Sequence, residues 1–158
     1  MELIQKRKEI LKEREEREMD LNKLDSVTKS ENGVWIPIRH EGSRTGIEIC
    51  IKGVDSKEFK TRSLSIRKYI HQQEKKKEEA DVEITQEKMI ELIAGITINW
   101  RDVSEEGVAL KVDKSGLILN GEVLKFNIEN AITLYTTLPF IAEQIASASA
   151  DRNLFLGV

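Results

Sequence analysis

The side chains best suited to chemistry in this sequence are one cysteine, Cys50, and two histidines, His40 and His71. A structural zinc site takes about four Cys or His ligands, and a nucleophile needs a base within hydrogen-bond reach. Cys50 alternates with isoleucines in a predicted strand, so we expect it to pack rather than react. His40 falls in a predicted turn and His71 on a polar helix end, so we expect both to face solvent.

Motifs that bind phosphates or metals are also missing from the sequence. It contains no G-x-x-x-x-G-K-[ST], no G-x-G-x-x-G and no H-E-x-x-H. Glu105 and Glu106 are adjacent, so on any regular element their carboxylates point in different directions and do not form an acid–base pair. We therefore expect a protein with no enzyme activity, no cofactor and no metal.

Charge is divided unevenly along the 158 residues. Residues 34–77 carry 11 Lys and Arg against 5 Asp and Glu, whereas residues 78–158 carry 6 against 14. Such asymmetry indicates parts of a chain that attract one another or that meet different partners. The basic region lacks the interleaved aromatic residues of single-strand binders, so nucleic acid is not the expected partner. No apolar run approaches the ~18 residues of a membrane span, so we expect no membrane partner either.

The first element expected to position a site is a charged helix. Residues 2–20 are strong helix formers without Gly or Pro. The apolar residues at its start make only a thin stripe: Leu3, Ile4, Ile10 and Leu11. Two interpretations stay open, a solvated and fraying helix or a helix that docks on a partner or on a second copy of the chain.

The pattern then changes from helical to extended. Residues 25–33 form a polar break, and apolar residues alternate over 34–38 and 47–51, which predicts two strands joined in a hairpin. Pro37 cannot donate to a ladder, so it places the first strand at a sheet edge. The following Asp55 to Glu58 segment has the form of a capping box and predicts a helix.

The carboxyl half is predicted to be mostly helical. A helix with Thr85 as its N-cap carries a regular apolar face, namely Met89, Leu92, Ile93, Ile96 and Trp100. Asn120-Gly121 predicts a short hairpin, because this pair supplies the positive φ of a type I′ turn. Asn127 is the expected cap of a helix to residue 138, and Pro139 begins another to about residue 150.

These elements predict an α+β protein with three regions. They are a charged N-terminal helix over residues 1–24, a strand-hairpin and helix unit over 25–79, and a mostly helical carboxyl unit over 80–158. The aromatic residues Trp100 and Tyr135 are predicted to lie in the core of the carboxyl unit.

Two blocks of this sequence carry a family likeness. The first contains Glu31-x-Gly33-x-Trp35 at the opening strand and Gly53-x-Asp55-Ser56 before the charged helix. The second comprises the segments 100–103, 106–107, 126–131, 138–141, 144–145 and 153–155. In their order and spacing the two blocks resemble tail assembly chaperones of bacteriophages with long, non-contractile tails. The resemblance spans residues 24–156.

The resemblance implies a non-catalytic protein of phage morphogenesis. Such chaperones act in the cytoplasm of the infected host and are absent from the mature virion. They bind the tape-measure protein, keep its apolar helical segments soluble and help deliver subunits of the tail tube. A structural virion component, such as a tail or head-completion protein, is the alternative from another class, and self-association stays open.

The acidic carboxyl unit is the expected binding region for a tape-measure protein. Its helices at 127–138 and 140–150 would hold amphipathic helices against a groove, where apolar anchors supply most of the affinity. The expected contact residues are Leu134, Ile141, Ile145 and Phe155. The alternative for all four is that they fill this protein's own core.

Overall fold

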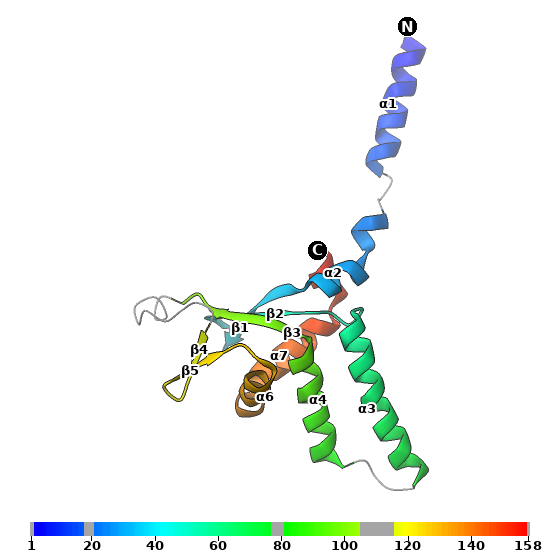
Figure 1. The fold of residues 1–158 in the computed structure, drawn as a ribbon. Coiled ribbons are helices and arrows are strands. Elements are labelled where there is room, and N and C mark those ends of the chain that lie inside the picture. The colour runs from blue at the N-terminus through cyan, green and yellow to red at the C-terminus, as the bar shows by residue number, and fades with distance from the viewer. Residues whose placement is uncertain (1, 18–20, 77–80, 105–115, 158) are drawn as a thin grey trace.

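The computed structural model describes residues 2–17, 21–76, 81–104 and 116–157 and has an α+β fold, as predicted (Figure 1). A sheet lies at the centre of the molecule, and α1 points away from the rest of the chain. In chain order the elements are α1 (Glu2–Arg17), the 3₁₀ helix η1 (Leu21–Leu24), α2 (Ser26–Asn32), β1 (Val34–His40), β2 (Ser43–Ile51), α3 (Lys57–Lys75), α4 (Val82–Ile96), β3 (Thr97–Asp102), β4 (Gly116–Leu119), β5 (Glu122–Lys125), α6 (Ile128–Thr137), α7 (Pro139–Ala150) and α8 (Arg152–Leu156).

The predicted hairpin is confirmed and forms part of a three-stranded antiparallel sheet with the order β1-β2-β3. Ile36 lies opposite Ile49, and Ile49 lies opposite Trp100, so the apolar residues of the strands share one face. Pro37 belongs to β1, which is an edge strand, as its missing N–H predicted.

The third strand corrects the prediction of one helix running from Thr85 through Trp100. Helix α4 ends at Ile96, and Thr97 turns the backbone to extended angles of φ −75° and ψ 131°. The β-branched and aromatic residues that follow suit a strand, and pairing with β2 satisfies backbone groups that the hairpin alone would leave free. Met89, which the helical pattern assigned to the core, is 42% exposed.

The structure confirms the predicted starts of α6 and α7 and corrects those of α4 and α3. Asn127 caps α6 by accepting a hydrogen bond from the Asn130 amide, and Pro139 is the first residue of α7, both as predicted. The cap of α4 is Asp81 and not Thr85, because the Asp81 carboxylate accepts from two amides of the first turn. In the segment predicted to start with a capping box, Ser56 is the residue that caps α3.

Residues 25–33, predicted to be a polar break, contain the helix α2. The Asp25 carboxylate accepts hydrogen bonds from the amide and the hydroxyl of Thr28, which lowers the pKa of Asp25. Gly33 ends the helix at a positive φ of 82°. Strong caps at both ends thus hold seven residues of modest helix propensity in a helix.

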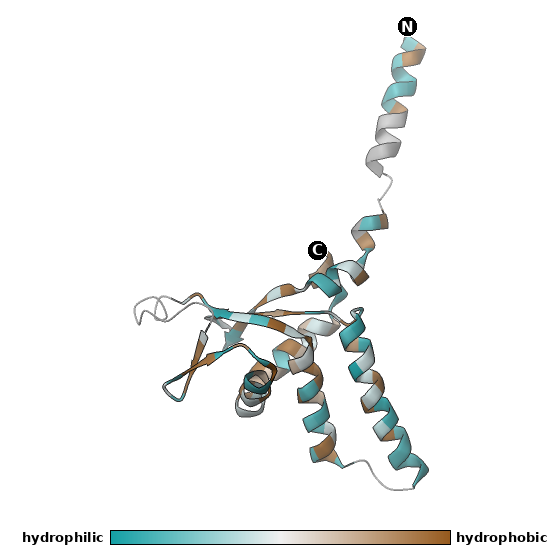
Figure 2. Ribbon diagram, viewed as in Figure 1, coloured by the Kyte–Doolittle hydropathy of each residue, from teal (hydrophilic) through white to brown (hydrophobic). Residues whose placement is uncertain are grey.

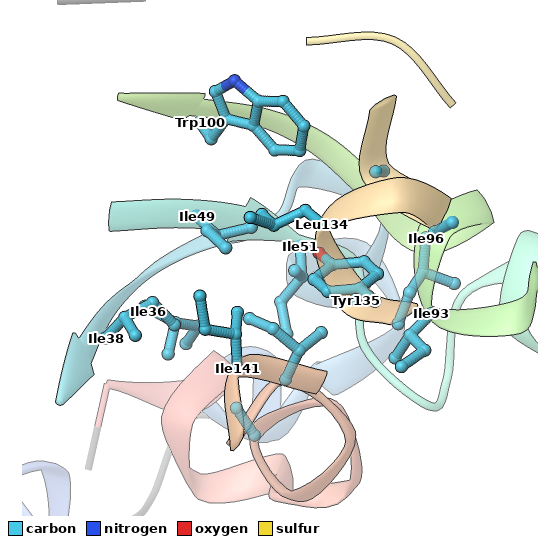
Figure 3. Close-up of a cluster of buried hydrophobic side chains, with 14 of the residues drawn as sticks. Ile36, Ile38, Ile49, Ile51, Ile93, Ile96, Trp100, Leu134, Tyr135 and Ile141 are labelled. Atoms are coloured by element: carbon cyan, nitrogen blue, oxygen red, sulfur yellow. The ribbon is translucent and has the colours of Figure 1, made fainter. Parts of the chain in front are cut away.

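One hydrophobic core joins the two units predicted for residues 25–79 and 80–158. Its buried residues come from the sheet, from α4, α6, α7 and α8, and from β4 (Figure 3). Trp100 and Tyr135 are fully buried in it, as predicted. The Trp100 indole N–H donates to the Leu124 carbonyl at 3.1 Å, and the Tyr135 hydroxyl lies 2.6 Å from the Thr97 hydroxyl. Burial raises the pKa of Tyr135.

The predicted Asn120-Gly121 hairpin is also confirmed. It joins β4 to β5, which pair as an antiparallel two-stranded sheet. The φ values of Asn120 and Gly121 are 53° and 78°, both positive as a type I′ turn requires. Leu117 anchors this small sheet to the main core.

A polar junction around Asp55 joins α2 to α8, the last helix of the described chain. The Asp55 carboxylate accepts two hydrogen bonds from the Arg152 guanidinium, at 2.8 and 3.0 Å, and one from the Ser26 hydroxyl at 2.6 Å. These bonds lower the pKa of Asp55 from 3.8 to about 2. The junction therefore links α2, the start of α3 and α8 through a single carboxylate.

Replacing Asp55 with Asn is expected to lower the free energy of unfolding at pH 7 by about 1–2 kcal/mol, because charge-assisted hydrogen bonds are lost and Arg152 is 61% exposed. A group whose pKa is lower in the folded state stabilises the protein above its unfolded-state pKa. The difference between wild type and variant should therefore be full above about pH 5 and shrink as the pH falls from 4 toward 2. Urea unfolding across this range measures it, with the exposed Glu122→Gln as control. A difference that does not change with pH would contradict the assignment.

Candidate partner-binding groove

Helices α4, α6 and α7 enclose a groove of about 860 Å³ on the surface of the carboxyl half. Its floor is apolar and consists of Ile90, Ile93, Ile132, Ala142 and Ala146. Four carboxylates border it: Glu83, Glu87 and Glu91 from α4, and Glu143 from α7. We call this site the acid-rimmed groove.

The carboxylates of α4 recur every four residues, so they lie in one row along the helix. None of the residues that line the acid-rimmed groove is Lys, Arg or His. The one lysine of α4, Lys88, lies on another face, where its ammonium group is 5.1 Å from the Tyr69 ring centroid. In the part of the chain that the structure describes, none of the four rim carboxylates forms an ion pair. The groove therefore favours positively charged ligands.

The floor remains open because small residues line the groove side of α7. Ile141 and Ile145 point into the core, whereas Ala142 and Ala146, one helical turn apart, line the groove. Met89, on the groove wall, leaves 42% of its surface exposed. In Figure 2, hydrophobic residues colour several turns of α4 and α6 in this part of the molecule. A flexible methionine beside small side chains gives an apolar surface that adapts to its partner.

The four residues predicted to contact a partner are placed elsewhere. Leu134, Ile141, Ile145 and Phe155 are all buried in the core, with at most 3% of their surface exposed. Phe155 lies beside Gly53, near the Asp55 junction and outside the lining of the acid-rimmed groove. In this conformation the four side chains fill the protein's own core, which was the stated alternative, because their helical faces turn toward the sheet.

The two helices predicted to bind a partner do line the acid-rimmed groove, but through their other faces. Ile132, Ala142 and Ala146 supply its floor, and sequence reasoning did not select them. The repeated glutamates at 83, 87 and 91 were the available signal, since their four-residue spacing marks one acidic edge of a helix. Alanines give no comparable signal, because they occur equally in cores and at open helix contacts.

A second hollow, of about 650 Å³, lies between the β1–β2 turn and α7. The Gln144 side chain spans its base by bonding the backbone N–H and carbonyl of Arg39, at 2.8 and 2.7 Å. The His40 ring packs against Phe140 with 5.1 Å between centroids. Cations and carboxylates are mixed around this hollow, so it lacks the single sign of charge of the acid-rimmed groove.

The residues considered for chemistry lie apart from one another. His71 is exposed on α3, and Cys50 is buried in β2, where burial raises the pKa of its thiol. Glu105 and Glu106 lie outside the described residues. Within the described ranges, no three His, Cys, Asp or Glu side chains are grouped so that they could hold a metal ion.

Two further findings bear on the site. Among the residues that the structure describes, no helix is both long and apolar enough to cross a membrane. No protein-family model matches the chain, and neither do any curated protein or solved structure. Function is therefore inferred from the acid-rimmed groove and from the residues around it.

Proposed function

We propose that the protein is a non-catalytic tail assembly chaperone that binds helical segments of a phage tape-measure protein in the acid-rimmed groove. The observation that carries this proposal is the groove itself, an apolar floor between three helices with carboxylates along its edges. An amphipathic helix with basic flanks complements such a surface, because its apolar stripe meets the floor and its cations meet the rim.

The length of the groove supports a helical ligand. Along α4 the wall runs from Glu83 to Ile93, which corresponds to about 15 Å of helix. A bound helix of about three turns would match this length and present apolar residues at i, i+3/i+4 and i+7. The rim carboxylates would mainly accelerate association, and the floor contacts would supply most of the affinity.

The biological setting of the proposal comes from the sequence resemblance. A tape-measure chain exposes apolar helical stripes until the tail tube closes around it, so a protein that covers those stripes would keep it soluble. The chaperone would act in the cytoplasm of the infected host, help to deliver tail-tube subunits and be absent from the mature virion. Mass spectrometry of purified virions is expected to find the tube protein in quantity and this chain only in trace amounts. A stoichiometric amount would favour a structural virion component.

Co-expression with the tape-measure protein of the same genome tests the binding site. Wild type is expected to keep the tape measure in the soluble fraction. Met89→Asp should weaken binding by about tenfold or more, because it places a charge on the exposed groove wall. Glu87→Lys combined with Glu91→Lys should slow association by about tenfold at low salt, since steering depends on the rim charges.

Matched variants on α3 and β5, outside the acid-rimmed groove, control for charge and exposure. Leu64 is 51% exposed, so Leu64→Asp reproduces the change at Met89 outside the acid-rimmed groove. Glu74→Lys combined with Glu122→Lys matches the change in net charge of the rim variant. If groove and control variants bind equally, the groove is not the site. If wild type does not keep the tape measure soluble, the chaperone proposal is wrong.

A further inference from the structure

Helix α1 extends away from the body of the protein (Figure 1), and it exposes three large apolar side chains. Leu3, Ile4 and Ile10 are 79%, 64% and 57% exposed. Within the described part of the chain, no side chain of residues 2–10 forms a hydrogen bond or ion pair with the body. Isolated helices near the length of α1, 16 residues, are only marginally stable in water, so this helix would gain from a binding partner.

Apolar and basic residues share one face of α1. That face consists of two neighbouring rows at helical spacing: Leu3, Ile4, Arg7, Lys8 and Ile10. Glu2 and Glu9 lie about two turns apart on the opposite side of the helix. Over residues 2–10 the exposed apolar stripe is therefore accompanied by positive charge, and the two glutamates of this segment face away.

This face complements the acid-rimmed groove in both chemistry and length. Leu3, Ile4 and Ile10 match the apolar floor, and Arg7 and Lys8 match a rim of four carboxylates without an ion-pair partner in the described residues. The segment 3–10 rises about 10 Å as a helix, which fits within the ~15 Å wall of α4.

The position of α1 points to a groove on another molecule. The chain enters the body through α2, which packs beside α8, and from there α1 runs away from the side where α4 and α6 lie (Figure 1). A second copy can bring its groove to the free helix. The two copies can then exchange helices reciprocally. This gives a closed twofold dimer in which each α1, here called the arm, occupies the groove of the other copy.

We propose that α1 of one copy binds in the acid-rimmed groove of a second copy, so that the protein self-associates by exchange of its N-terminal helices. The inference rests on the groove being a helix-binding site, as in the proposed function. The tape-measure protein then competes with α1 for the same surface, and a client helix must displace the arm. Free chaperone thereby keeps its own apolar surfaces covered.

Sedimentation velocity on the full chain tests the exchange. Wild type is expected to dimerise reversibly at concentrations on the order of 100 µM, as small interfaces do, and more weakly at high salt. Ile4→Asp combined with Ile10→Asp (the arm variant) should raise the dimer dissociation constant by about tenfold or more. Glu87→Lys combined with Glu91→Lys (the rim variant) should weaken dimerisation in the same way. Leu64→Asp should leave it unchanged.

Mixing the two variants gives the sharpest result. The arm variant keeps an intact groove and the rim variant keeps an intact α1, so their mixed dimer retains one of the two helix–groove contacts. An equimolar mixture should therefore associate more weakly than wild type but more strongly than either variant alone. Adding Arg7→Glu and Lys8→Glu to the rim variant should restore self-association by reversing both charges. Circular dichroism establishes beforehand that every variant is folded.

Three outcomes would overturn the inference: wild type monomeric at all concentrations, dimers insensitive to both the arm and the rim variants, or a mixture of the two variants that associates no more strongly than either variant alone. The proposed function fails separately. If the copies exchange α1 helices but the tape-measure protein stays insoluble, the proposed chaperone function is wrong and the helix exchange stands. If the groove variants no longer bind the tape-measure protein while wild type is monomeric, the helix exchange is wrong and the proposed chaperone function stands.

Discussion

Ile145→Asp is expected to unfold the protein in dilute buffer at 25 °C. Ile145 is fully buried in α7, within the core that the sheet and helices share. An unpaired carboxylate there loses its hydration without gaining a partner, a change in the class that costs more than about 4 kcal/mol. A typical domain has only about 5–15 kcal/mol of stability, so a cost of this size is enough to unfold a domain at the low end of that range. Far-UV circular dichroism and urea unfolding measure the effect.

Two controls separate burial from position on α7. Ile145→Val keeps the apolar character and should cost about 0.5–1.5 kcal/mol. Ser147 is exposed on the same helix, so Ser147→Asp should change stability by no more than about 0.5 kcal/mol. If Ile145→Asp remained as stable as Ser147→Asp, Ile145 would face solvent, and Leu134, Ile141, Ile145 and Phe155 would again be candidate partner contacts.

Trp100→Ala is expected to destabilise the protein by about 3–5 kcal/mol. The indole is fully buried, packs edge to face on Phe126 with 5.2 Å between centroids and donates a hydrogen bond to Leu124. It therefore attaches the small β4–β5 sheet to β3, and its removal leaves a cavity between them. The difference in free energy of unfolding between wild type and variant, from urea titration, gives the value.

The intermediate variant Trp100→Phe tests which part of the side chain matters. It keeps a ring against Phe126 but leaves the Leu124 carbonyl without its donor, so its cost should fall below that of Trp100→Ala. A change of less than about 0.5 kcal/mol for Trp100→Ala would place the indole in solvent and contradict the register of β3.

Local signals in the sequence predicted those elements that local chemistry determines. The β1–β2 hairpin followed from alternation of apolar residues. The cap Asn127 marked the start of α6, and Pro139, as first helical residue, marked the start of α7. The strand β3 was not predicted, because it follows α4 without a break and Trp100 also fits the helical spacing of Ile96. Its strand conformation depends on pairing with β2, a contact that no local pattern encodes.

The sequence predicted two of the helices that line the candidate site, α6 and α7, but not the residues that line it. Large apolar side chains of α6 and α7 were predicted to contact a partner. Because burying large apolar side chains stabilises the fold most, these residues fill the core instead. What remains at the surface is a weaker stripe of Ile132, Ala142 and Ala146, whose role depends on α4 lying beside it. Such a binding surface consists of residues that the core does not bury, so it can be identified only once the packing of the helices is known.

The position of β3 in the sheet has a consequence for synthesis on the ribosome. β2 is complete at Ile51, but its partner strand is complete only at Asp102, 51 residues later. At about 5–20 residues per second, the ribosome needs about 3–10 s to supply it. During this interval the nascent hairpin has one unpaired edge and an uncovered isoleucine face, which is when pairing with a neighbouring nascent chain is most probable. Pro37 removes one N–H donor from the outer edge of β1, so the β2 edge is the better template during this interval.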